Sequence, residues 1–293
     1  MTAAALILLG WALLVVSPPG ALAEAADGLR VVWRPARPAA GDVAWVSVQG
    51  APAEASVEGS LGGRSLAFFA YGGGHAALSG LDLETKAGAQ PWRLAILESG
   101  REPRTVRGTL HIRPRDFPVE RLTLPPAMVD LDPETERRAL GEAERLRTLF
   151  RMLTSERLWR GRFTRPVAGS EPGSGFGARR IINGQPRAPH GGTDYAAPLG
   201  APVVAANSGR VVLVAEYFFP GRLVVLDHGF GLYTLYFHLD AVSVTEGDLV
   251  DRGQPIGTVG ATGRATGPHL HFGVQVGTAR VDPARLLGLS LAD

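Results

Sequence analysis

The sequence predicts a mainly β protein in which two β-rich parts are joined by one amphipathic helix. Glycine (38 residues) and proline (22 residues) are both abundant in a chain of 293 residues, and they favour turns and short strands over long helices. Runs of β-prone residues recur between these turns, and only one stretch shows helical spacing. The hydrophobic content of 45% and the charged content of 20% are typical of a globular chain.

The N-terminus predicts a signal peptide at residues 1–23. The apolar run at residues 3–16 is shorter than the about 20 residues that a membrane-spanning helix needs. Residues 17–20 then break a helix, and residues 21–23 form a small-x-small cleavage site before Glu24. Because no lysine or arginine precedes the apolar run, an uncleaved membrane anchor is the alternative. Both interpretations predict export, to the periplasm or the cell envelope.

Residues 27–115 predict an N-terminal immunoglobulin-like β-sandwich. Short β-prone runs lie between glycine and proline turns, as is typical of such sandwiches; the runs are residues 29–33, 43–48, 65–71, 91–97 and 109–112. This part carries no cluster of residues that is suited to catalysis. We interpret its two histidines, His75 and His111, as structural residues.

Residues 116–160 predict a linker followed by a connecting amphipathic helix. The segment 116–126 contains three prolines and shows no clear period. Asp132 is a suitable N-cap, with Pro133 at the first helical position, and we expect the helix to end near Ser155. Apolar residues recur at helical spacing: Leu140, Ala143, Leu146, Leu149, Phe150 and Leu153. We expect this face to pack on a domain rather than on a membrane.

Residues 161–293 predict a C-terminal antiparallel β-sheet domain. Strand-like runs occur at residues 203–206, 209–214, 222–227, 232–238 and 256–259, and glycine-rich turns separate them. Connections this short suit antiparallel hairpins better than helical crossovers. The sequence therefore predicts two β-rich domains with the helix between them.

Composition limits the chemistry that this chain can perform. It contains no cysteine, which excludes a disulfide framework, a thiolate metal site and a cysteine nucleophile, so that His, Asp or Glu must hold any metal. The net charge is +2, and Lys86 is the only lysine. This mild and diffuse basic charge suits an anionic polymer or a membrane surface. A nucleic-acid partner is disfavoured, because such proteins carry a denser basic patch.

Histidines gather in the last part of the chain in a pattern that suits metal-dependent hydrolysis. His269 and His271 are two apart in a β-prone run, so both imidazoles face one side of a strand. His190 and Asp194 are four apart, with glycines between them, and His238 ends an aromatic run. His190, Asp194 and one of the paired histidines could hold zinc and leave a position for water.

The chemistry of such a site follows from the metal and from the histidines left over. Bound zinc lowers the pKa of water towards 7 and so makes hydroxide available to attack an amide carbonyl. The two histidines that do not bind the metal could act as general base and as stabiliser of the oxyanion.

Three segments resemble the motifs of the lysostaphin-type, LytM-like zinc metallopeptidases, which cleave the peptide part of bacterial peptidoglycan. They are His-Gly-Gly-Thr-Asp at residues 190–194, Phe-His-Leu at 237–239 and Thr-Gly-Pro-His-Leu-His-Phe at 266–272. The resemblance runs from about Phe163 to Pro283 and does not cover residues 1–155. It implies a metallopeptidase domain with a groove.

The resemblance also implies a role for each site residue. His190, Asp194 and His271 correspond to the zinc ligands of that family, and His238 and His269 to its catalytic histidines. Residues 175–184 resemble a loop at the edge of the groove in part of the family, which makes Arg180 and Asn183 candidates for substrate binding. His228, in a hairpin turn, is interpreted as structural.

The resemblance implies a zinc-dependent endopeptidase that hydrolyses stem or cross-link peptides of peptidoglycan by means of metal-activated water. The alternative is a catalytically silent cell-wall binding module that activates an amidase, since some relatives with this fold have lost their site residues. All five residues are present here, which favours the enzyme. A structural or adhesion role of the β-sandwich is a weaker hypothesis, because no functional cluster precedes residue 160.

Overall fold

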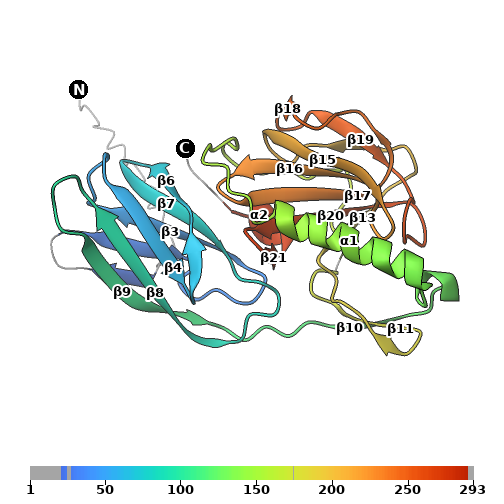
Figure 1. Ribbon diagram of the computed structural model, residues 1–293, viewed down its shortest axis with the longest axis horizontal. Helices are drawn as coiled ribbons and strands as arrows, with labels where there is room; N and C mark the ends of the chain where they lie inside the picture. The colour runs from blue at the N-terminus through green and yellow to red at the C-terminus, as the bar shows by residue number, and fades with distance from the viewer. Residues whose placement is uncertain (1–20, 25–27, 174, 290–293) are drawn as a thin grey trace, which may run out of the picture.

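The computed structural model describes residues 21–24, 28–173 and 175–289 and confirms the mainly β fold (Figure 1). The named strands form four sheets, in which every strand pair is antiparallel except β10 with β11. Within these ranges no helix is both long and apolar enough to span a membrane. The predicted signal peptide lies mostly outside the described residues; its last three residues belong to strand β1, which pairs with β2.

The N-terminal half is a sandwich of two antiparallel sheets, with strand orders β1-β2-β3-β7-β6 and β5-β4-β8-β9. Both sheets line one apolar core, in which the rings of Trp33 and Trp92 lie 6.3 Å apart. The immunoglobulin-like topology remains a prediction. The strands are β1 Ala21–Glu24, β2 Arg30–Arg34, β3 Val43–Gln49, β4 Ser56–Leu61, β5 Arg64–Leu66, β6 Phe68–Tyr71, β7 Gly74–Gly80, β8 Gly88–Leu97 and β9 Arg104–Ile112.

Strand β7 escaped the sequence analysis because most of its residues are glycine, alanine and serine, which carry little β-propensity. Every residue of β7 is buried, so the sequence shows no alternation of apolar and polar residues. Ala77 packs in the core of the sandwich, whereas Ala76 and Leu78 belong to a second core that continues into the C-terminal half. Small residues let the two cores approach this strand closely.

The segment that we predicted to be a linker carries regular structure. Strand β10 (Val119–Leu122) pairs in parallel with β11 (Arg179–Ile182), and the 3₁₀-helix η1 spans Pro126–Met128. Strand β12 (Gln185–Pro186) completes this small sheet. Residues 116–126 therefore belong structurally to the C-terminal half.

Helix α1 (Pro133–Leu149) begins as predicted, because the Asp132 side chain accepts hydrogen bonds from the backbone N–H groups of Glu134 and Thr135. It ends before Ser155. The helix does not continue beyond Leu149. In the segment that follows, the Tyr233 hydroxyl donates to the Met152 carbonyl at 2.7 Å. The prediction that Leu140 packs on a domain is wrong, since its side chain is 60% exposed. The helix packs on the sheet through its last turn instead.

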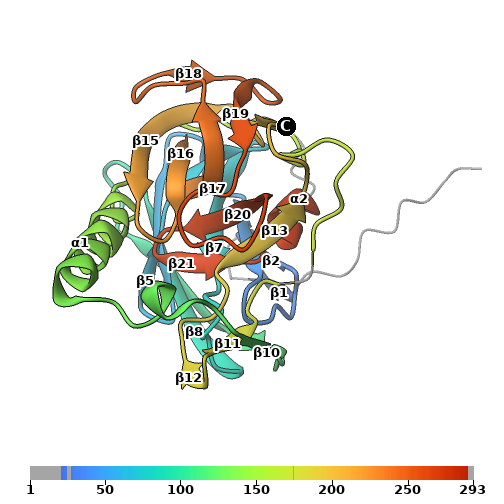
Figure 2. The same cartoon turned by 90° about the vertical axis from the view of Figure 1, so that its right-hand side faces the viewer.

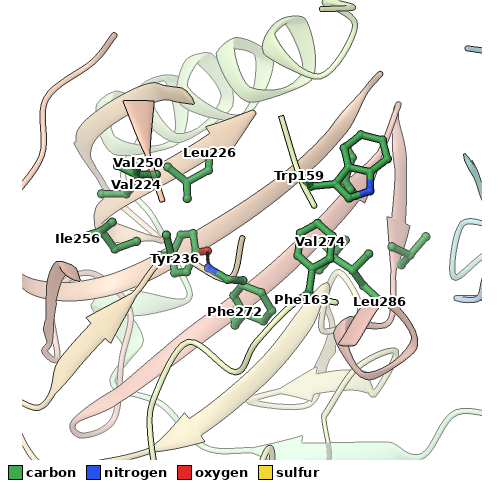
Figure 3. Packing of buried hydrophobic residues seen from close by; sticks show 14 of the residues in the cluster. Trp159, Phe163, Val224, Leu226, Tyr236, Val250, Ile256, Phe272, Val274 and Leu286 are labelled. Atoms are coloured by element: carbon green, nitrogen blue, oxygen red, sulfur yellow. Dashed lines mark hydrogen bonds between the residues drawn. The ribbon is translucent and has the colours of Figure 1, made fainter. Parts of the chain in front are cut away.

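The C-terminal half is built around a nine-stranded sheet with the main order β13-β20-β17-β16-β15-β18. Figure 2 looks onto β13, β20 and β17, with α1 to one side. Figure 3 shows part of the core, where the rings of Tyr236 and Phe272 lie 5.3 Å apart. The elements are β13 Gly192–Ala196, β14 Pro202–Val204, β15 Gly209–Tyr217, β16 Gly221–Gly229, β17 Leu232–Val242, β18 Leu249–Val250, β19 Pro255–Val259, β20 His269–Val276, β21 Ala279–Val281 and α2 Pro283–Leu287.

The two halves share one continuous apolar core. Trp45 and Phe69 of the sandwich pack in the same cluster as Trp159 and Val276. Trp159 meets Phe69 edge to face, with ring centroids 5.4 Å apart. Outside this core Asp82, which follows β7, accepts hydrogen bonds from the Arg280 side chain of β21 at 3.1 and 3.2 Å. The sandwich is therefore fixed against the sheet that carries the histidines.

We expect Asp82→Asn to lower the free energy of unfolding by about 1.5–3 kcal/mol, the value of hydrogen bonds to a charged group. Burial by itself raises the pKa of Asp82, but the hydrogen bonds from Arg280 lower it overall, below its ordinary value of 3.8. Because the pKa is lowered in the folded protein, Asp82 stabilises the fold fully at pH values above its ordinary pKa. This stabilisation is lost as pH falls through the folded pKa.

Urea melts of the wild type and Asp82→Asn at several pH values test this expectation. The difference should be constant from pH 5 to 8 and should shrink only in strong acid. Glu84→Gln is the matched control, because Glu84 also contacts Arg280, at 3.2 Å, but is exposed. Equal stability of the two variants would contradict a role for Asp82 in joining the halves.

Candidate active site

Strand register brings Asp194 and His271 together. In the antiparallel pair of β13 with β20, Asp194 lies directly opposite His271, and Ala196 lies opposite His269. His190 comes from the segment just before β13. Its backbone N–H donates to the Ala178 carbonyl at 2.9 Å, and its own carbonyl accepts from Gly177 N–H at 2.8 Å. The imidazole is thereby held beside the strand pair.

Three side-chain atoms that could bind a metal, His190 Nε2, Asp194 Oδ1 and His271 Nδ1, form a small triangle. His190 Nε2 lies 3.1 Å and His271 Nδ1 lies 2.9 Å from Asp194 Oδ1, and the two nitrogens are 2.8 Å apart. Hydrogen bonds alone cannot satisfy this arrangement: if both imidazoles donate to the carboxylate, two N–H groups face each other. A cation at the centre satisfies all three atoms, and tetrahedral zinc with bonds of about 2.0–2.1 Å would need only slightly wider spacing.

The protonation states of these groups suit a cation. Burial by itself would raise the pKa of Asp194, but hydrogen bonds from His190 and His271 lower it far below its usual range, so the carboxylate is ionised. Burial lowers the pKa of His271, whose ring stacks on Phe237 with centroids 5.3 Å apart. Metal binding requires this combination of carboxylate and neutral imidazole.

His238 and His269 face the triangle as a second pair, with ring centroids 4.7 Å apart. His238 Nδ1 contacts the Thr262 carbonyl at 2.8 Å, and His269 Nδ1 contacts the Gly267 carbonyl at 2.9 Å. A carbonyl can only accept, so each Nδ1 carries the proton and each Nε2 keeps a free lone pair. His269 Nε2 lies 3.9 Å from Asp194 Oδ1.

The backbone at His238 is strained. Its φ angle is +63°, a conformation that costs a residue with a side chain roughly 1–3 kcal/mol. Its N–H donates to the Pro220 carbonyl at 2.8 Å, which holds the residue in place. Burial is the main cause that lowers the pKa of His238 to about 3. Its imidazole is therefore neutral, and Nε2 is available to accept a hydrogen bond.

Two comparisons with known proteins show the family of this chain. The model of peptidase family M23 matches residues 188–283. A crystal structure assigned to peptidase M23 from Pseudomonas aeruginosa is 30% identical, with a TM-score of 0.67, over 86% of this chain and 96% of that one. This chain belongs to peptidase family M23.

Curated relatives of this M23 chain match it over a short region. Peptidoglycan DD-endopeptidase ShyB of Vibrio cholerae serotype O1 is 49% identical over 94 residues, which are 32% of this chain and 22% of ShyB. Peptidoglycan DD-endopeptidase ShyA of the same organism is 46% identical over 100 residues, which are 34% of this chain and 23% of ShyA. The matched region thus spans less than a quarter of these relatives.

Arg180 of this M23 chain lies beside the triangle, whereas Asn183 is engaged elsewhere. Arg180 Nη2 is 3.9 Å from Asp194 Oδ2, and its Nε donates to Glu120 at 3.1 Å. The Asn183 amide accepts from the Leu124 N–H at 3.0 Å and donates to the Leu124 carbonyl at 2.9 Å. We therefore keep Arg180 alone as a candidate for substrate binding and treat Asn183 as structural.

The structure also assigns His228 to the core. Its Nδ1 contacts the Ser208 carbonyl at 2.7 Å and its Nε2 the Thr234 hydroxyl at 2.8 Å. Burial lowers its pKa to about 4. Both nitrogens are therefore used inside the sheet, and the imidazole takes no part in the site.

Two residues that support the site were missed by the sequence analysis. Glu120 pairs with Arg180 across β10 and β11, which requires a parallel pairing of segments that are far apart in sequence. Thr262 orients His238 through its carbonyl, which every residue type possesses. The neighbouring Gly263 is a signal that the sequence does contain, because a Cβ there would clash with the backbone nitrogen of Gly221. Glycine thus lets two loops meet beside His238.

Proposed function

We propose that this chain is a zinc-dependent endopeptidase that hydrolyses peptide bonds in the stem or cross-link peptides of bacterial peptidoglycan. The observation that carries the proposal is the triangle of His190 Nε2, Asp194 Oδ1 and His271 Nδ1 with two further histidines facing it. Membership of family M23 and the names of its relatives as peptidoglycan DD-endopeptidases support the substrate class.

His190, Asp194 and His271 would hold the zinc ion. Two imidazole nitrogens and one carboxylate oxygen form a donor set that is typical of catalytic zinc and that leaves one position open. When bound, zinc supplies Lewis acidity and lowers the pKa of water to about 7. Arg180 would offset the negative charge of Asp194 through the second carboxylate oxygen.

His269 and His238 would handle the protons and the developing charge of peptide hydrolysis. Each presents a free Nε2 on the face of the sheet that carries the triangle, and neutral imidazole can take a proton from the attacking water. Once protonated, either ring can hydrogen-bond the oxyanion or pass the proton to the leaving amine. The backbone carbonyls of Thr262 and Gly267 keep both rings in the required orientation.

Peptidoglycan as substrate implies a location in the cell envelope. Export would follow from the predicted signal peptide at residues 1–23, and membrane anchoring would arise only if that segment is not cleaved. The silent amidase activator remains the alternative. The presence of all five site residues in one place favours the enzyme.

Digestion of purified cross-linked peptidoglycan, analysed by mass spectrometry, tests the proposal. We expect cross-linked muropeptides to be converted to uncross-linked ones, activity to disappear with a chelator and Zn²⁺ to restore it. The new peptide ends identify the bond that is cleaved. Stoichiometric zinc binding without cleavage of any peptidoglycan would instead support the silent module.

A further inference from the structure

A cavity of 590 Å³ lies between the two halves of the molecule, next to the proposed metal site. One wall is the loop after β7, which includes Glu84 and Lys86, and the other is formed by β11 and the segment after β12. Pro189 lines the cavity and precedes the ligand His190 in sequence. Arg180 lines the cavity as well and lies 3.9 Å from Asp194.

The charge of this cavity is strongly positive. Its basic lining residues come from both halves and are Lys86, Arg115, Arg179, Arg180 and Arg187, whereas Glu84 is its one acidic lining residue in the described part of the chain. Glu84 contacts Arg280 at 3.2 Å, and Arg115 pairs with Asp282 at 2.6 Å. Arg180 pairs with Glu120 at 3.1 Å, so the uncompensated positive charge of the lining comes from Lys86, Arg179 and Arg187.

Several of these cations have no carboxylate partner among the described residues. Lys86 and Arg179 are exposed and form no ion pair there. Arg187 donates from Nη2 to the Val129 carbonyl at 3.0 Å and to the Gln185 side chain at 2.6 Å, while its buried Nε has no partner.

The positive field extends to a loop near the metal site. Arg264 lies between β19 and β20 and stacks on Phe219, with its guanidinium carbon 4.1 Å from the ring centroid. The pKa of Arg264 is lowered, first by its burial and then by the positive charges of Arg180 and Arg187. Arg264 follows by two residues the Thr262 carbonyl that contacts His238, so it adds a further positive charge near the site.

The loop that carries Lys86 is held in place rather than free. The Asp82 carboxylate accepts from Glu84 N–H at 3.0 Å and from the Arg280 backbone N–H at 2.9 Å. Thr85 N–H donates to the Asp82 carbonyl at 2.8 Å. Arg280 belongs to β21, which pairs with the site strand β20. The only lysine of the chain is thus fixed opposite the cations of β11.

We propose that this cavity binds free carboxylates of an acidic peptide substrate and that the N-terminal half contributes Lys86 to the binding site. The proposal rests on the proposed function, since the stem peptides of peptidoglycan are acidic peptides with free carboxylates. Arginine forks bind carboxylates in bidentate fashion, and lysine acts as a point charge. The N-terminal half is then part of the substrate site and not a spacer.

The test compares Lys86→Glu, Arg179→Glu and the double variant with Arg107→Glu. Arg107 is the matched control, because it is an exposed arginine on β9 that does not line the cavity. KM and kcat are measured on soluble cross-linked muropeptides with free carboxylates and on the same muropeptides with amidated carboxylates. For the free acids we expect KM to rise about 3–10-fold in each single variant and more in the double variant, with kcat and zinc content unchanged.

On amidated muropeptides, and at high salt, the variants should match the wild type, because the charge interaction is absent or screened. Lys86→Arg should restore the wild-type KM. An unchanged KM in the double variant, beside normal cleavage by the wild type, would overturn the carboxylate site and leave the proposed function intact.

If the wild type cleaves no muropeptide, the proposed function fails, and the cavity is judged by binding alone. Fluorescence anisotropy of a labelled acidic stem peptide then supplies the readout. Weaker binding by the double variant than by Arg107→Glu supports the carboxylate site, and equal binding overturns it.

Discussion

Replacing His271 with alanine should release the metal and abolish hydrolysis together, whereas replacing its neighbour His269 should abolish hydrolysis alone. His271 Nδ1 completes the triangle with His190 and Asp194, so its removal leaves two protein ligands, too few for a stable catalytic zinc site. His269 Nε2 lies farther away, 3.9 Å from Asp194 Oδ1, where it can exchange protons with the substrate. His269→Ala should therefore retain zinc near one equivalent and lose about 10²–10⁴-fold in turnover.

The measurement is zinc content by atomic emission beside peptidoglycan cleavage for each purified variant. His190→Ala and Asp194→Ala should behave like His271→Ala, and His238→Ala should behave like His269→Ala. His111→Ala is the control, since His111 is an exposed histidine on β9 in the sandwich. Loss of zinc in His269→Ala with retention in His271→Ala would reverse the assignment of ligand and catalyst.

Within each motif, short-range rules predict which side chains lie close together. His269 and His271 share a face through the two-residue period of a strand, and two glycines lie between His190 and Asp194. What the sequence could not predict is the orientation of each ring. His238 is oriented by the carbonyl of Thr262, and a backbone atom leaves no trace in the residue type.

The fold was predictable where strands carry β-branched and aromatic residues and was not where strands consist mainly of small residues or pair with distant partners. Strands β3 and β7 are both covered on two faces, but β3 is rich in valine and contains a tryptophan and was found, whereas β7 consists mainly of small residues and was missed. Strand β10 pairs with β11, about sixty positions further along the chain, and no local pattern encodes that pairing. The basic cavity could not be predicted for the same reason, because Lys86 and Arg179 are far apart in sequence and line one cavity only in the folded chain.

Trp159 is a further residue whose structural role depends on contacts between distant segments. It lies in the segment 116–160 that the sequence analysis interpreted as linker and helix, yet its side chain is only 1% exposed. It packs edge to face on Phe69 of the sandwich, and the guanidinium of Arg157 lies 5.8 Å from its ring centroid. One side chain thus joins the core of the C-terminal sheet to the N-terminal half.

We therefore expect Trp159→Ala to lower the free energy of unfolding by about 3–5 kcal/mol, the usual cost of deleting a buried aromatic side chain. Met152→Ala is the control from the same segment; its side chain is 61% exposed, so its effect should stay within about 0.5 kcal/mol. Urea melts of both variants, with zinc present in excess, provide the comparison. If Trp159→Ala is as stable as Met152→Ala, the segment before residue 161 is a dispensable linker after all. A large difference means that the C-terminal sheet depends on it, because a loss of this size is a substantial part of the 5–15 kcal/mol that stabilises a typical protein.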